Sequence, residues 1–163
     1  MSTEVYEGGC YCGAVRFIAR PPVLSAQVCH CSTCRRLQSA SLGVLACFFA
    51  KDALDFSAGK DKLAEYLSPK SYSRLFCTGC GTRIGLTFEK APIAIPMVGL
   101  YPTVFDKVRD GGALPEELRP RMHIYYAERL FDILDGVDKF ADTPEQWGGS
   151  GKRLDDRGAP LSS

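Results

Sequence analysis

The sequence has 163 residues, and its 20 Lys and Arg against 19 Asp and Glu give a formal net charge of +1 at pH 7. A chain of this length can bury a hydrophobic core of its own, and its balanced charge lacks the basic surface of a nucleic-acid-binding protein. Its apolar runs are too short to span a membrane. Because the N-terminal residues lack the pattern of a signal peptide, we expect a cytoplasmic protein whose cysteines stay reduced.

Near the N-terminus, Cys10 and Cys12 lie between Gly9 and Gly13. Glycine permits the positive φ of a turn whose amides point at thiolates, so this pair is typical of a metal-binding knuckle. Residues 14–20 then show the alternation of a strand, with Val15, Phe17 and Ala19 on one face and Arg16 and Arg20 on the other, and the strand is predicted to end at the prolines that follow.

A second strand is predicted over residues 23–28, directly before the triplet Cys29, Cys31 and Cys34. Ser32 or Thr33 could cap a short helix over residues 34–39. The free amides and the dipole at the start of this helix would favour thiolates and any anionic group beside them.

Two arginines, Arg35 and Arg36, add positive charge next to the triplet. They are candidates for binding a carboxylate of a substrate. The alternative is that they are ordinary solvated side chains.

The run 42–49 is short and continuously apolar, which predicts a buried strand. Cys47 belongs to this run. A lone cysteine in such a run usually acts as a small apolar side chain, although Cys47 could also be a further metal ligand.

After turn and edge residues at 51–59, two strands are predicted over 62–67 and 71–76, and the second leads into Cys77. Cys77 and Cys80 form a Cys-x-x-Cys-Gly motif, which is typical of zinc ribbons. A thioredoxin-like redox pair is the alternative, but Gly79 and Gly81 disfavour the helix that it requires.

The remaining elements are predicted in chain order. Further strands are expected over 83–88, 93–100 and 122–126, and the segment 105–120 is expected to be a loop with at most one helical turn. His123 is interpreted as a strand residue, with a ligand role as the alternative. Residues 148–163 contain few apolar side chains, so we expect a disordered tail after a single zinc-binding domain at 1–147.

Counting the ligands predicts two zinc ions per chain. Two cysteine pairs supply the four ligands of a closed structural site, while a triplet leaves one exchangeable position. Disulfides are the alternative, but the spacings are too tight to cross-link loops.

These motifs resemble those of the glutathione-dependent formaldehyde-activating enzymes, which are grouped with centromere protein V. The resemblance covers roughly residues 6–140, through Gly-Cys-x-Cys-Gly, Cys-x-Cys-x-x-Cys, Phe-Cys-x-x-Cys-Gly and a late His-Ile pair. It implies a mainly β fold of the β-tent type, with small sheets around zinc and one or two short helices.

The resemblance also implies roles for the cysteines. Cys10, Cys12, Cys77 and Cys80 would hold the structural zinc, and the triplet would hold a second, open zinc. The implied activity is that of a carbon–sulfur lyase, which condenses glutathione with formaldehyde to S-hydroxymethylglutathione. The alternatives are a non-catalytic zinc-stabilised binding module and a thiol-based redox or metal sensor. The segment 128–131 departs from the family pattern.

Overall fold

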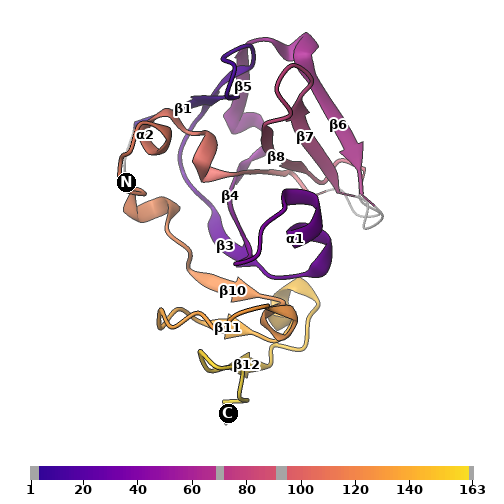
Figure 1. Cartoon of the computed structure of the whole chain (residues 1–163), viewed down its shortest axis with the longest axis vertical. Coiled ribbons are helices and arrows are strands. Elements are labelled where there is room, and N and C mark those ends of the chain that lie inside the picture. The colour runs from indigo at the N-terminus through magenta and orange to yellow at the C-terminus, as the bar shows by residue number, and fades with distance from the viewer. Residues whose placement is uncertain (1–3, 69–71, 91–94, 162–163) are drawn as a thin grey trace. The chain divides into compact units, whose positions relative to one another are not determined.

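The computed structural model describes residues 4–68, 72–90 and 95–161. Within them the fold is mainly β, with two sheets and two short α-helices, which confirms the fold class expected from the sequence (Figure 1). The chain divides into two compact units. The first contains Met1–Ser25 and Ala46–Leu118, and the second contains Ala26–Leu45 and Arg119–Ser163. The single domain expected over residues 1–147 stays a prediction.

A three-stranded antiparallel sheet lies in the first unit, in the order β1-β2-β5. Its strands are β1 (Tyr6–Gly9), β2 (Arg16–Ala19) and β5 (Leu54–Ala58). Val15, Phe17 and Ala19 are buried, as their alternation with arginine predicted. Neither β1 nor β5 was expected, because β1 is short and glycine-rich and β5 is mostly exposed.

The first unit also contains antiparallel strands in the order β4-β9-β8-β7-β6. Of these, β6, β7 and β8 lie side by side in Figure 1. The strands are β4 (Val44–Ala50, which starts in the second unit), β6 (Leu63–Leu67), β7 (Ser73–Cys77), β8 (Arg83–Thr87) and β9 (Met97–Leu100). All five were predicted, although residues 71 and 93–94 of the predicted strands lie outside the described residues. The expected helical turn is α2 (Asp106–Arg109).

The core of the first unit is rich in aromatic side chains. The ring of Phe105 lies 5.6 Å from that of Tyr6, 5.8 Å from that of Phe17 and 6.2 Å from that of Phe49, measured between ring centroids. All four side chains are buried. Their packing joins β1, β2 and β4 to the segment before α2, and contributes both apolar burial and edge-to-face contacts.

In the second unit, β10 pairs in parallel with β3 and with β11, and β12 is antiparallel to β11. The strands are β3 (Ser25–Cys29, which starts in the first unit), β10 (Met122–Ile124), β11 (Lys139–Phe140) and β12 (Arg153–Leu154). The helix α1 (Ser32–Gln38) follows β3. Among the described residues, no helix is both long and apolar enough to cross a membrane.

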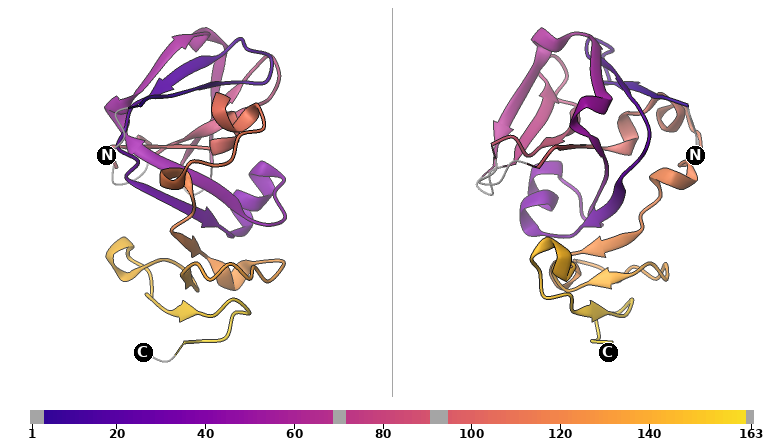
Figure 2. Two further views of the ribbon diagram at one scale, coloured as in Figure 1. Left: turned by 90° about the vertical axis from the view of Figure 1, so that its left-hand side faces the viewer. Right: turned by 180° about the vertical axis from the view of Figure 1, so that it is seen from behind.

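The disordered tail expected from residue 148 onward is wrong for residues 148–161, which form β12 and ordered turns (Figure 2). Leu154 is buried, and Asp156 forms an ion pair with Lys139. Composition alone could not indicate this order, since it depends on polar contacts with the rest of the unit rather than on apolar content.

Candidate metal centres

The first cysteine group combines the turn after β1 with the turn between β7 and β8. The sulfur atoms of Cys10, Cys12, Cys77 and Cys80 all lie within 4.8 Å of one another. Cys10 and Cys77 are buried, whereas Cys12 is exposed. Four sulfurs at this spacing suit a tetrahedral metal ion such as zinc.

Local hydrogen bonds shape both turns of this group. The Gly13 N–H donates to the Cys10 carbonyl at 3.1 Å, and the Gly81 N–H donates to the Cys77 carbonyl at 2.8 Å. Both glycines have a positive φ, 77° and 72°, a backbone conformation that is unfavourable for residues with a Cβ atom. The Val15 N–H also points at the Cys10 sulfur, at 3.2 Å, as the knuckle interpretation expected.

The electrostatics of the group favour a bound cation. Hydrogen bonds from Thr82 lower the pKa of the Cys80 thiol to about 6. In contrast, the pKa of Cys12 is raised to about 11, because the Cys10 and Cys80 sulfurs outweigh the hydrogen bond from the Ala14 amide. Four neighbouring thiols cannot all lose their protons without positive charge beside them, so this donor set fits a metal ion.

The second cysteine group lies where β3 meets α1. The sulfur atoms of Cys29, Cys31 and Cys34 lie within 4.8 Å of one another. Cys31 is itself the N-cap of α1, and its sulfur accepts a hydrogen bond from the Cys34 N–H at 3.4 Å. The predicted cap at Ser32 or Thr33 is therefore wrong, since the helix starts two residues earlier than expected. The other two sulfurs raise the pKa of Cys29, which again favours a cation.

The backbone amides at the start of α1 were expected to be free to bind an anion, but the structure differs. The Ser32 N–H donates to the Glu128 carboxylate at 2.7 Å. Arg35 donates through Nε to the His30 carbonyl at 2.8 Å, while Arg36 is exposed. The first-turn amide is thus already bound by the chain's own carboxylate. A role of Arg35 or Arg36 in substrate binding stays a prediction.

The two alternative ligands named from the sequence lie outside these groups. Among the described residues, neither cysteine group includes Cys47 or His123. Cys47 is fully buried in β4 and donates to the Leu118 carbonyl at 3.4 Å, as expected of a core residue. His123 is 1% exposed and contacts His30 and Asp135.

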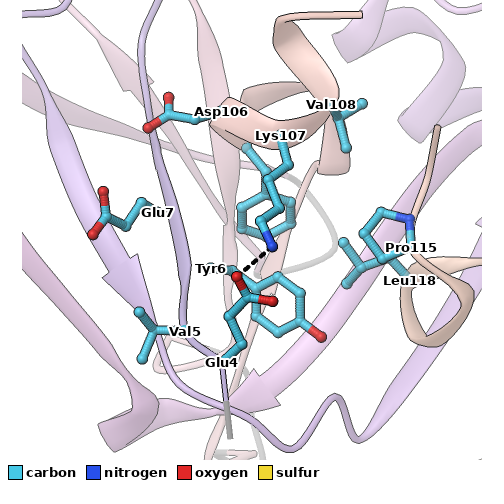
Figure 3. Close-up of a pocket in the computed structure, with 10 residues that line it drawn as sticks. Glu4, Val5, Tyr6, Glu7, Asp106, Lys107, Val108, Pro115 and Leu118 are labelled. Atoms are coloured by element: carbon cyan, nitrogen blue, oxygen red, sulfur yellow. Dashed lines mark hydrogen bonds and ion pairs between the residues drawn. The ribbon is translucent and has the colours of Figure 1, made fainter. Parts of the chain in front are cut away.

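The first unit also has a cavity of about 230 Å³ between β1 and α2 (Figure 3). Its lining residues are Glu4, Val5, Tyr6, Glu7, Phe105, Asp106, Lys107, Val108, Pro115 and Leu118. Lys107 pairs with Glu4 at 2.5 Å, and no cysteine lines the cavity. The cavity lining therefore includes none of the cysteines of the candidate metal centres.

Fold and cysteine geometry together define a mainly β protein with two cysteine groups that could hold metal ions. The family model of the glutathione-dependent formaldehyde-activating enzyme matches residues 5–128. Because this match extends over most of the chain, the protein belongs to that family, as the cysteine motifs predicted.

A solved structure of similar fold is a Rhodobacter sphaeroides protein, a Northeast Structural Genomics target. It has 25% sequence identity and a TM-score of 0.51, and the similarity covers 67% of this chain and 97% of that chain. Among curated proteins, none matches.

Proposed function

We propose that this protein is a zinc-dependent carbon–sulfur lyase that acts on glutathione or a related thiol adduct at Cys29, Cys31 and Cys34. The observation that carries the proposal is that this group offers three sulfurs within 4.8 Å, while Cys47 is hydrogen-bonded elsewhere. Three protein ligands are typical of catalytic zinc sites, which keep one position for water or substrate. Family membership supports glutathione as the thiol.

The two groups would hold two zinc ions with different roles. Cys10, Cys12, Cys77 and Cys80 fill four positions, so a zinc ion there would be structural. The triplet would leave one position open, and zinc bound there would lower the pKa of a thiol that occupies it. The protein's part is to hold the three sulfurs at the junction of β3 and α1.

The proposed reaction needs no oxidant or reductant. The thiol sulfur attacks the carbonyl carbon of an aldehyde such as formaldehyde, the carbon–sulfur bond forms, and the carbonyl π bond breaks. The thiol proton is lost and the former carbonyl oxygen gains a proton, so the product is a hemithioacetal, which for formaldehyde carries an S-hydroxymethyl group. Positioning supplies most of the catalysis in such an addition. The exposed Arg36, two residues after Cys34, would bind a carboxylate of glutathione.

A cobalt-substituted protein tests this proposal, because the absorption of cobalt responds to a change of ligand. We expect glutathione to change the spectrum, and S-methylglutathione, which has no free thiol, to leave it unchanged. Cys47→Ser should leave the starting spectrum unaltered, whereas Cys31→Ser should remove the response. If glutathione has no effect and Cys47→Ser alters the spectrum, a binding module with two closed metal sites takes the place of the enzyme.

Activity provides the second readout. Exchange between free formaldehyde and S-hydroxymethylglutathione should be faster with the zinc-loaded protein than with Cys31→Ser at equal concentration. Equal rates would exclude formaldehyde as the aldehyde. We propose a cytoplasmic location, where glutathione is abundant, and no nucleic-acid partner.

A further inference from the structure

A continuous chain of polar side chains extends through the second unit from its C-terminal segment to His30. Nε2 of His30 lies 2.8 Å from Nδ1 of His123, and Nε2 of His123 lies 2.9 Å from a carboxylate oxygen of Asp135. The other Asp135 oxygen lies 2.6 Å from Nζ of Lys139. Lys139 also pairs with Asp156 at 2.6 Å.

The centre of this chain is shielded from water. His30, His123 and Lys139 are each 1% exposed, and the Tyr126 ring packs edge-on against both histidines. Buried polar groups are costly unless they are hydrogen-bonded. Each of these three side chains has at least one hydrogen-bond or ion-pair partner in the contacts described above, so loss of one member would leave a buried group without it.

The hydrogen bonds also determine which ring nitrogens carry protons. Asp135 is an ionised carboxylate held by Lys139, so it accepts a hydrogen bond from Nε2–H of His123. Nδ1 of His123 is then an acceptor, and Nε2–H of His30 donates to it. Each histidine is thereby fixed in one tautomer and one ring orientation.

His30 lies between two members of the triplet, Cys29 and Cys31. Its backbone N–H donates to the Ile124 carbonyl at 3.0 Å, and its own carbonyl accepts from Arg35 Nε at 2.8 Å. With its ring held by His123, this residue is anchored at three separate points. The backbone that carries the Cys29 and Cys31 sulfurs is therefore held rigidly.

We propose that Asp135, His123 and His30 are positioning residues for the triplet, and that they set its metal affinity by holding Cys29 and Cys31 in place. Asp135, Lys139 and Asp156 lie beyond residue 128, where the family match ends. The C-terminal segment therefore supports the metal centre through hydrogen bonds, without supplying a ligand. This inference rests on the part of the proposed function that gives the triplet a metal ion.

The test uses cadmium-loaded protein, because NMR gives each cadmium site its own resonance and a chelator titration gives each site's affinity. We compare the wild type with Asp135→Asn, His123→Phe and Asp135→Glu. The matched control is Asp138→Asn, since Asp138 has an exposed side chain and pairs with Arg153 at the surface. The four-cysteine group in each variant is the internal reference.

We expect Asp135→Asn and His123→Phe to weaken metal binding at the triplet by about tenfold or more and to move its resonance. The four-cysteine resonance and the Asp138→Asn spectrum should not change, and Asp135→Glu should recover part of the affinity. Because Asp135 is 33% exposed, Asp135→Asn should fold even if His123→Phe does not.

The inference would be overturned if Asp135→Asn bound cadmium at the triplet as tightly as the wild type. It would also be overturned if the variant lost affinity equally at both cysteine groups, because that result would show a role in fold stability alone. A wild type that binds cadmium only at the four-cysteine group would instead refute the proposed function, so the two failures are distinguishable.

Discussion

The Thr82 hydroxyl oxygen lies 3.1 Å from the Cys80 sulfur and accepts a hydrogen bond from the Tyr11 N–H at 3.0 Å. Because the oxygen accepts from Tyr11, the hydroxyl hydrogen is available to donate to the Cys80 sulfur. One side chain thus joins the turn of Cys10 and Cys12 to the turn that carries Cys80.

Thr82→Val should weaken metal binding at the four-cysteine group. Valine keeps the shape of threonine but leaves both Tyr11 N–H and the Cys80 sulfur without this partner. We expect a cost of about 1 kcal/mol, equivalent to about fivefold in affinity, because the contact is partly solvated. Competition with a chelator, monitored at the four-cysteine cadmium resonance, measures the change.

Thr82→Ser is the control, since serine retains the hydroxyl and should bind metal like the wild type. Equal affinities for the valine and serine variants would mean that the bridge contributes nothing to the site.

The two cysteine groups should differ in their importance for folding. A metal at the first group connects residues 10–12 to residues 77–80, so its binding free energy stabilises the fold. We expect Cys10→Ser to cost about 4 kcal/mol or more, and therefore to give unfolded or insoluble protein.

Cys31→Ser should remain folded, for a reason specific to this position. Cys31 caps α1 through its sulfur, and serine is a good N-cap, so the substitution removes a metal ligand while retaining the cap. We expect a change in the free energy of unfolding within about 1 kcal/mol. Thermal unfolding followed by circular dichroism checks both variants. Similar destabilisation by both substitutions would make the triplet structural as well.

The cysteine spacing predicted both groups because ligands that share a metal must be close, and short turns bring them together locally. The contacts that support the groups could not be predicted in this way. Thr82, Glu128 and Asp135 are ordinary polar residues in the sequence, and each gains its role from a partner brought near by the fold. The order of the tail was missed for the same reason, since Asp156 pairs with a buried lysine.

Gly59 should tolerate no side chain. It has a φ of 68°, and a Cβ atom there would lie 1.9 Å from the Ala14 carbonyl oxygen, which is backbone and cannot easily move. We expect Gly59→Ala to cost about 3 kcal/mol or more, from the left-handed conformation and the clash together. Chemical denaturation gives the free energy of unfolding.

Gly111→Ala separates the two contributions. Gly111 also has a positive φ, 87°, but a Cβ atom there would meet nothing within 4 Å. We expect a cost of only about 1 kcal/mol. If Gly59→Ala cost no more than this control, the close contact between residue 59 and the Ala14 carbonyl would add nothing to the cost of the substitution.

Tyr6 should make the protein less stable at alkaline pH. The side chain is buried against Phe49 and Phe105, and its hydroxyl donates to the Glu117 carboxylate at 2.9 Å. Burial first, and then the Glu117 hydrogen bond and charge, raise the pKa of Tyr6 well above its ordinary value of 10.0. The folded protein therefore keeps the phenol proton at a pH where the unfolded chain loses it.

The sign of the effect follows from proton linkage. The contribution of Tyr6 is fully present below pH 10.0, the ordinary pKa, and is lost as the pH rises from there toward the raised folded pKa. Tyr6→Phe has no phenol proton, so it should cost about 1 kcal/mol at neutral pH through the lost hydrogen bond and show a flatter alkaline profile. Denaturant unfolding from about pH 8 to about pH 11 measures both curves.

Tyr66→Phe, at a side chain that is 46% exposed, is the control, and its stability curve should run parallel to that of the wild type. Parallel curves for the wild type and Tyr6→Phe would show that the buried phenol does not govern the alkaline loss of stability.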